Sequence, residues 1–294
     1  MQEQENDILK RVRKIEIKTR GLSNEIFAGK YHSAFKGRGM SFSEVREYRV
    51  GDDVRDIDWN VTARSRRPHV KIYEEERELT MMLMVDVSRS RAFGTTDRLK
   101  QSLATEIAAV LAFSASQTGD KVGCILFSDK VEKFIPPKKG RAHILMIIRT
   151  LICFEPESNG TALSEAVRFL SGVSKKRCTT FIISDFMNPR RDDAPLDDAL
   201  KIASSRHDLI AVRVTDPREH EMPDVGIIEL QDAETDRKVW VDTSSRRVRE
   251  HYAEQWRERE RHTVEMLRRG RIDTATISTD GDYVVELIKL FKQR

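Results

Sequence analysis

A short, continuous apolar run, Thr80 to Val85, ends in Asp86, and this feature constrains the fold of the chain most. A strand that is buried on both faces has such an uninterrupted run, whereas a strand with one solvated face alternates apolar and polar residues. Thr179 to Ser184, followed by Asp185, repeats the pattern, and Leu209 to Val214 is a further apolar segment. These runs predict strands in the interior of a mainly parallel sheet.

Segments with helical spacing of apolar residues separate the predicted strands. Leu99, Leu103 and Ile107 fall on one helical face, and Asp97 is placed to cap that helix. Alternating strands and helices predict an α/β fold, a doubly wound, mainly parallel sheet with helices on both faces. Val131 to Ile135 is expected to pair with the strand at 122–127 as an antiparallel edge strand.

The chain is expected to have two parts. Residues 1–77 are charged, carry one amphipathic stripe at 8–15, and are expected to pack on the core as an N-terminal segment. Residues 78–294 are expected to form the α/β domain, with a small hairpin insertion near 226–242.

Composition excludes several classes of protein. Of 294 residues, 34% are charged, and no run reaches the roughly 18–20 apolar residues that span a bilayer. The acidic N-terminus lacks the basic and apolar regions of a signal peptide. The three cysteines, Cys124, Cys153 and Cys178, lie in or beside apolar runs, which predicts reduced core thiols. The chain is therefore expected to be cytoplasmic, with no membrane span.

Oxygen-bearing side chains follow the predicted buried strands. The carboxyl ends of strands that flank the reversal of a doubly wound sheet form a binding crevice. An all-oxygen set of carboxylates and hydroxyls suits a hard cation, Mg²⁺ or else Mn²⁺ or Ca²⁺. If the hydroxyls bind directly and the carboxylates act through water, one coordination position is left for a partner's carboxylate. The predicted ligands are Asp86, Ser88, Ser90, Thr161 and Asp185.

The spacing Asp86-x-Ser88-x-Ser90, together with Thr161 and Asp185, resembles the metal-ion-dependent adhesion site of von Willebrand factor A domains. A preceding segment narrows the resemblance, with Gly37-x-Gly39-x-x-Phe42, Arg46-Glu47-Tyr48 and Gly51-Asp52-Asp53-x-Arg55-x-Ile57-Asp58-Trp59. Together these motifs resemble the bacterial family called domain of unknown function 58, whose genes lie beside those of MoxR-type AAA+ ATPases. The resemblance implies a von Willebrand A-like, non-enzymatic interaction module, with such an ATPase or its client protein as partner.

The charged segment around Arg46 has two interpretations. Its mixed charges predict an ion-pair network that pins the N-terminal segment to the core. The alternative is a docking surface, in which aromatic side chains act as anchors for a partner. The candidate partner-binding residues are Arg46, Tyr48, Arg55, Asp58 and Trp59.

Two other functions are weaker alternatives. A strand that ends in Asp also begins phosphohydrolases of the haloacid-dehalogenase type, but these need a second Asp where this chain has Ser88. The sequence also lacks a P-loop and an HExxH motif. Nucleic-acid binding could use the basic stretch from Arg64 to Lys71. However, acidic residues follow that stretch, no aromatic side chains are interleaved with it, and the net charge of the chain is only +4.

Overall fold

The computed structural model describes residues 10, 13, 15–16, 41–74, 79–88, 99–158, 160–187, 193–231 and 238–294. The chain divides into two compact units. Residues Lys36–Leu79 form the smaller unit, and Met1–Phe35 with Thr80–Arg294 form the larger, α/β unit. The carboxylate of Glu16 pairs with Arg141 of the α/β unit. The packing of 1–77 on the core as one segment stays a prediction, and most of the amphipathic stripe at 8–15 lies outside the described residues.

The smaller unit is an antiparallel hairpin with a helical connection. Strand β1 (Ser41–Glu47) pairs with β2 (His69–Glu74), and η2 (Val54–Asp56) and α3 (Trp59–Ser65) lie between them along the chain. Asp53 and Asp58 cap the two short helices through their side chains. Acidic residues at these positions therefore satisfy amide groups that a helix leaves without partners.

The side chains that the structure describes in the smaller unit bury little apolar surface. Among its described side chains, Val70 alone is buried. Arg46 instead makes a bidentate contact with Asp52, with both N–O distances at 2.7 Å. Ladder hydrogen bonds and local ion pairs thus contribute to the stability of the smaller unit.

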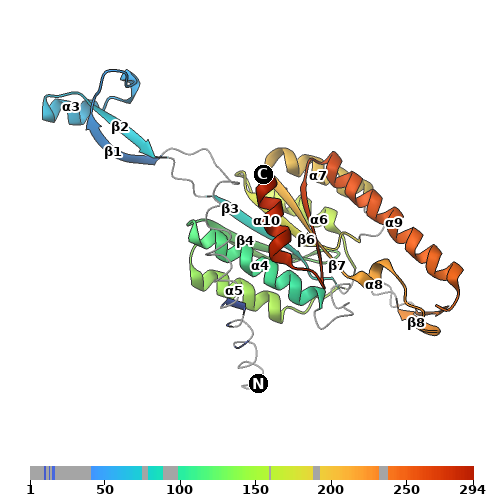
Figure 1. Ribbon diagram of the computed structural model, residues 1–294. Coiled ribbons are helices and arrows are strands. Elements are labelled where there is room, and N and C mark those ends of the chain that lie inside the picture. Colours follow the sequence, from blue (N-terminus) through green and yellow to red (C-terminus); the bar gives the residue numbers. More distant parts are fainter. Residues whose placement is uncertain are drawn as a thin grey trace. The chain divides into compact units, whose positions relative to one another are not determined.

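The α/β unit is built on a six-stranded sheet of order β10-β7-β6-β3-β4-β5 (Figure 1). All neighbouring pairs are parallel except β4 and β5. The predicted doubly wound, mainly parallel α/β class is therefore confirmed. The strands are β3 (Thr80–Asp86), β4 (Lys121–Phe127), β5 (Val131–Lys138), β6 (Thr179–Ser184), β7 (Asp208–Thr215) and β10 (Asp273–Ser278).

Strand β5 lies at the edge of the sheet and contains Pro136 and Pro137. Its register with β4 shifts beside these prolines. Gly123 of β4 makes room for the shift, because a Cβ atom there would lie 2.9 Å from Cγ of Pro137.

Helices cover both faces of the sheet. One face packs on α6, α7 and α9, whose apolar side chains join Met82, Met84 and Ile182 in one buried cluster. The other face packs on α4 and α10, where the rings of Phe181 and Phe291 meet edge to face at 6.3 Å. The helices are α4 (Lys100–Gln117), α5 (Arg141–Cys153), α6 (Leu163–Val173), α7 (Asp193–Arg206), α9 (Arg246–Arg269) and α10 (Tyr283–Gln293). In the described part of the chain, no helix has the length and apolar character needed to cross a membrane.

A short helix and a hairpin connect β7 with α9. Helix α8 (Pro217–His220) is followed by β8 (Ile227–Gln231) and β9 (Lys238–Asp242), which form a two-stranded antiparallel sheet. Ile227 and Trp240 of this hairpin are exposed.

The direction of the winding reverses between β3 and β6. The chain runs from β3 outward through β4 to β5, and then returns to β6 on the other side of β3 before continuing to β7 and β10. The carboxyl ends of β3 and β6 are thus hydrogen-bonded neighbours at the reversal, as the sequence predicts.

Two details differ from expectation. Cys153, at the end of α5, is exposed rather than part of the core, whereas Cys124 and Cys178 are buried, and these three cysteines form no disulfide with one another. Leu99 is an exposed N-cap residue, because α4 begins only at Lys100. Asp97, the predicted cap, lies outside the described residues.

Candidate functional site

Two buried carboxyl groups lie at the ends of neighbouring strands. Asp86 is the last residue of β3, and Asp185 directly follows β6. Val85 and Ile183 pair in the parallel ladder, so the two chain segments run side by side up to these residues. Asp86 is fully buried and Asp185 is 6% exposed.

Hydrogen bonds fix the Asp86 carboxyl group at both oxygens. The backbone N–H of Ser88 donates to Oδ1 at 2.9 Å, and the hydroxyl of Ser184 donates to Oδ2 at 2.7 Å. The Ser184 hydroxyl itself accepts from the backbone N–H of Phe186. The carboxyl group of Asp86 is therefore oriented by its own turn and by the adjacent strand.

Among the described residues, only hydrogen-bond donors act against the electrostatic cost of burying a charge at Asp86. Burial raises the pKa of Asp86 above its ordinary value, the negative charge of Asp185 raises it further, and hydrogen bonds from Ser88 and Ser184 act against this rise. In the part of the chain that the structure describes, no basic side chain pairs with Asp86. A cation at this place would lower the electrostatic cost of burying the carboxylate.

Of the other three predicted ligands, the structure describes Ser88 and Thr161. Ser88 is buried next to Asp86, whereas Ser90 lies outside the described residues. Thr161 is also buried, and the next residue, Ala162, donates its N–H to the carbonyl of Ser128 at 2.9 Å. Ser128 follows β4, the neighbour of β3. The backbone at Thr161 therefore lies, like Asp86, at the carboxyl ends of the parallel strands.

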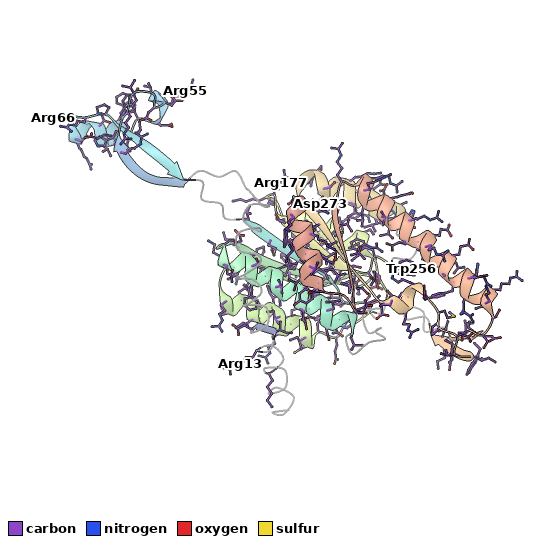
Figure 2. All side chains as sticks on the ribbon, viewed as in Figure 1. Arg13, Arg55, Arg66, Arg177, Trp256 and Asp273 are labelled. Carbon is purple, nitrogen blue, oxygen red and sulfur yellow. The ribbon has the colours of Figure 1, made fainter. Side chains whose placement is uncertain are left out.

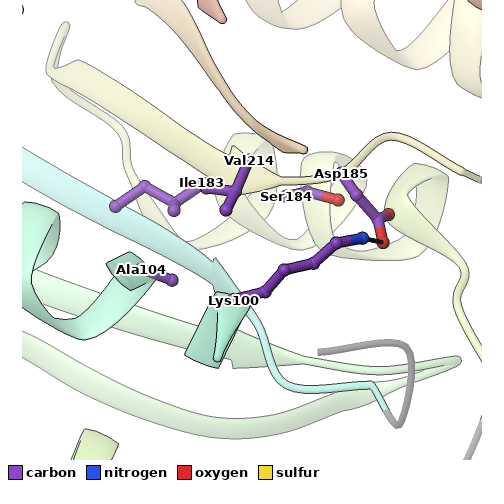
Figure 3. Close-up of a pocket in the computed structure, with 6 residues that line it drawn as sticks. All are labelled: Lys100, Ala104, Ile183, Ser184, Asp185 and Val214. Carbon is purple, nitrogen blue, oxygen red and sulfur yellow. Dashed lines mark hydrogen bonds and ion pairs between the residues drawn. The ribbon is translucent and has the colours of Figure 1, made fainter. Parts of the chain in front are cut away.

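Sequence reasoning missed a lysine in this site. Lys100, the first residue of α4, is 1% exposed, and its Nζ lies 3.1 Å from Oδ2 of Asp185 (Figure 3). The ammonium group also contacts the carboxylate of Glu219. Burial lowers the pKa of Lys100, but the charges of Asp185 and Glu219 outweigh this effect and raise the pKa above its ordinary value. Lys100 is therefore a buried cation held between two carboxylates.

Glu219 lies on the short helix α8 and was likewise not predicted. Its carboxylate accepts from the backbone N–H of Asp216 at 3.0 Å, which completes a capping box with the Asp216 side chain. Burial raises the pKa of Glu219 above its ordinary value, against the opposing effect of Lys100. For Lys100 the sequence offers only an indirect signal. The residue carries a positive charge at the beginning of an apolar helix, where the helix dipole disfavours it, but this does not reveal its partners.

The chemistry of the predicted ligands would suit a hard divalent cation. Among the described residues, no group of three or more His, Cys, Asp or Glu side chains is arranged to hold a metal. The carboxyl groups of Asp86 and Asp185 would therefore act with the hydroxyls of Ser88, Ser90 and Thr161, an all-oxygen set of the kind that Mg²⁺ accepts.

The predicted partner-binding residues all belong to the smaller unit. Arg46 is engaged with Asp52, and Asp58 caps α3 and lies 3.7 Å from Nζ of Lys71. Trp59 is 68% exposed, Arg55 is also exposed (Figure 2), and Tyr48 is half-buried. The described ion pairs of Arg46 and Asp58 thus join residues of the smaller unit to each other.

Comparisons with known proteins place the chain in a family. The model of the family described as "Protein of unknown function DUF58" matches residues 44–262. An uncharacterized protein of Mycobacterium tuberculosis and one of Mycobacterium bovis are each 30% identical over 287 residues, which cover 96% of this chain and 88% of each relative.

Solved structures with a similar fold include the conserved hypothetical protein BatB from Bacteroides thetaiotaomicron. It has a TM-score of 0.50 at 15% identity, and the match covers 73% of this chain and 98% of that one. An aerotolerance-related membrane protein from Bacteroides fragilis matches with the same TM-score at 16% identity, over 73% of this chain and 97% of that one. The von Willebrand A domain of SpRpn10 gives a TM-score of 0.42. By the family model and the mycobacterial relatives, the chain belongs to the DUF58 family.

Proposed function

We propose that this protein is a non-enzymatic interaction module that binds a divalent cation, preferably Mg²⁺, at the carboxyl ends of its central strands. The ligands are Asp86, Ser88, Ser90, Thr161 and Asp185. The cation uses its open position to bind a carboxylate of an acidic partner. The observation that carries the proposal is the buried, mutually repelling pair of Asp86 and Asp185, in which no described basic side chain neutralises Asp86.

The chemistry of the site favours binding over catalysis. Both oxygens of Asp86 accept hydrogen bonds, which hold the group in place but leave it poorly suited to attack a substrate. The position two residues on is Ser88, which cannot serve as the general acid of a phosphohydrolase. Neutral hydroxyl ligands leave much of the cation's charge uncompensated, and that charge attracts an anionic partner.

The family resemblance nominates the partner. A MoxR-type AAA+ ATPase, or a client protein of that ATPase, would supply the acidic side chain, and the two proteins would meet in the cytoplasm. The chain would then act as an accessory factor in the assembly or maturation of a protein complex.

Replacing Asp86 by asparagine is expected to weaken Mg²⁺ binding by roughly a hundredfold, because the amide is nearly the same size but carries no charge. Isothermal titration of the full chain with MgCl₂ measures the affinity, and Asp280→Asn, at an exposed turn, is the matched control. Equal Mg²⁺ affinity of wild type and Asp86→Asn would contradict the metal site. Magnesium-dependent turnover of a phosphoester that Asp86→Asn abolishes would instead favour the phosphohydrolase alternative.

The smaller unit supplies a second contact with the partner in this proposal. The side chain of Trp59 is exposed, and an aromatic side chain of this kind commonly anchors an interface. We expect Trp59→Ala to reduce capture of a MoxR-type ATPase at least tenfold while leaving the melting temperature within about 1 °C, since the ring is mostly exposed to solvent. Unchanged capture in a pulldown at millimolar Mg²⁺ would assign Trp59 no part in binding.

A further inference from the structure

The cation already present at the site is the ammonium group of Lys100. Its Nζ lies 3.1 Å from Oδ2 of Asp185, and its side chain is 2% exposed. A cavity of about 10 Å³ adjoins Lys100, Ser184 and Asp185 (Figure 3), at the lower limit for one water molecule. With so little solvent nearby, the positive charge is weakly screened and acts strongly on its neighbours.

We propose that Lys100 is a tethered competitor of the divalent cation, which holds the Asp185 carboxylate and thereby sets the metal affinity of the site. This inference rests on the proposed metal-binding function. Asp185 cannot give its full charge to a metal while the ammonium group is hydrogen-bonded to it. The same ammonium also repels a second cation bound close by.

Glu219 is a second counter-ion for the ammonium group of Lys100. Its carboxylate contacts the same ammonium group from α8, and its other oxygen is fixed by the backbone N–H of Asp216. A cation that takes Asp185 therefore does not leave Lys100 buried without a counter-ion, because Glu219 still neutralises it. Glu219 thus draws the ammonium away from Asp185 and favours metal binding.

The same contact connects the site with helix α9. His220, the residue after Glu219, stacks on Trp256 of α9 with 3.7 Å between ring centroids. Helix α8 therefore carries one residue that faces Lys100 and another that packs on α9.

Two substitutions should change the metal affinity in opposite directions. Lys100→Met keeps a long apolar stem but removes the charge, so we expect Mg²⁺ and Mn²⁺ to bind roughly tenfold more tightly or better. Glu219→Gln removes the second counter-ion and leaves Lys100 to Asp185, so we expect both metals to bind about threefold more weakly or worse. Lys289→Met, which breaks an exposed ion pair with Glu286 on α10, should leave the affinity unchanged.

The measurement is isothermal titration of each full-length protein with MgCl₂ and, separately, MnCl₂. Melting curves with and without metal give a second measure, because a ligand raises the stability of the form that binds it. Lys100→Met should gain more in melting temperature from Mg²⁺ than wild type does.

The outcomes separate this inference from the proposed function. Tighter binding by Lys100→Met, or binding by that variant alone, supports the competitor role. Binding by wild type that Lys100→Met leaves unchanged or weakens would overturn the role but leave the metal site intact. No binding by any of the proteins would overturn the metal site, and the competitor role with it. If Lys100→Met does not fold, the Mg²⁺ affinity of Glu219→Gln tests the inference instead. An affinity of Glu219→Gln equal to or higher than that of wild type would contradict the competitor role.

Discussion

Replacing Glu260 by glutamine is expected to lower the free energy of unfolding by about 3 kcal/mol, and Glu260→Ala by up to about 5 kcal/mol. Arg213 of β7 is 2% exposed, and its guanidinium makes two parallel hydrogen bonds to the Glu260 carboxylate of α9, at 2.6 and 2.5 Å. Its Nε has no hydrogen-bond partner among the described residues. Without the carboxylate, a positive charge would stay buried with no counter-ion.

Two further variants distinguish the loss of the Arg213–Glu260 ion pair from a general effect of substitution on α9. Glu258→Gln, at an exposed position on the same helix, is expected to change the stability by no more than about 0.5 kcal/mol. In the double variant Arg213→Met/Glu260→Gln much of the stability should return, because the buried charge is gone as well. Urea unfolding measures all of these proteins. A cost of under 1 kcal/mol for both Glu260 variants would show that the pair does not brace α9 against the sheet.

The same pair predicts an acid-sensitive component of stability. The hydrogen bonds from Arg213 lower the pKa of Glu260 below its ordinary value, against the opposing effect of burial. A carboxylate with a lowered folded-state pKa stabilises the protein fully above the unfolded-state pKa of 4.5, and this contribution disappears as the pH falls through the folded-state pKa. Wild type should therefore lose its advantage over Glu260→Gln below about pH 4.5.

Phe181→Ala is expected to cost about 3–5 kcal/mol of unfolding free energy. The ring is completely buried in the central strand β6 and meets Phe291 of α10 edge to face. Truncation removes apolar contact and leaves a cavity that strands hydrogen-bonded on both sides cannot close. Urea or thermal unfolding gives the value.

Phe169 of α6 offers a matched comparison, because it is only half-buried, and its ring centroid lies 5.5 Å from that of Phe134. The same substitution there should cost less than half as much. Equal costs at Phe169 and Phe181 would mean that burial in the sheet interior does not control stability in this fold.

The strands and helices of the α/β unit could be predicted from the sequence because burial on two faces produces uninterrupted apolar runs. Thr80 to Val85 and Thr179 to Ser184 are such runs, and both are fully or almost fully buried strands. Turn chemistry and helix ends were less predictable. Leu99 fits the helical spacing but stands before the first turn of α4, since periodicity alone does not determine where a helix begins.

The candidate site was predictable only in part. Asp86 and Asp185 could be predicted because each follows an apolar run, and the winding of the sheet brings such strand ends together. Lys100 and Glu219 could not, since their meeting depends on side chains 119 positions apart in the sequence. A buried ion pair between a helix start and a four-residue helix leaves no periodic signal in either segment.

The two prolines of β5 limit strand pairing at this edge of the sheet. Neither Pro136 nor Pro137 has an amide hydrogen, so an extended segment that approached this border would find an interrupted row of donors. Strand addition, the route by which many sheets bind peptides, is disfavoured on this side. The same interruption disfavours pairing of β5 with the sheet of another copy, whereas β10, the strand at the opposite edge of the sheet, contains no proline.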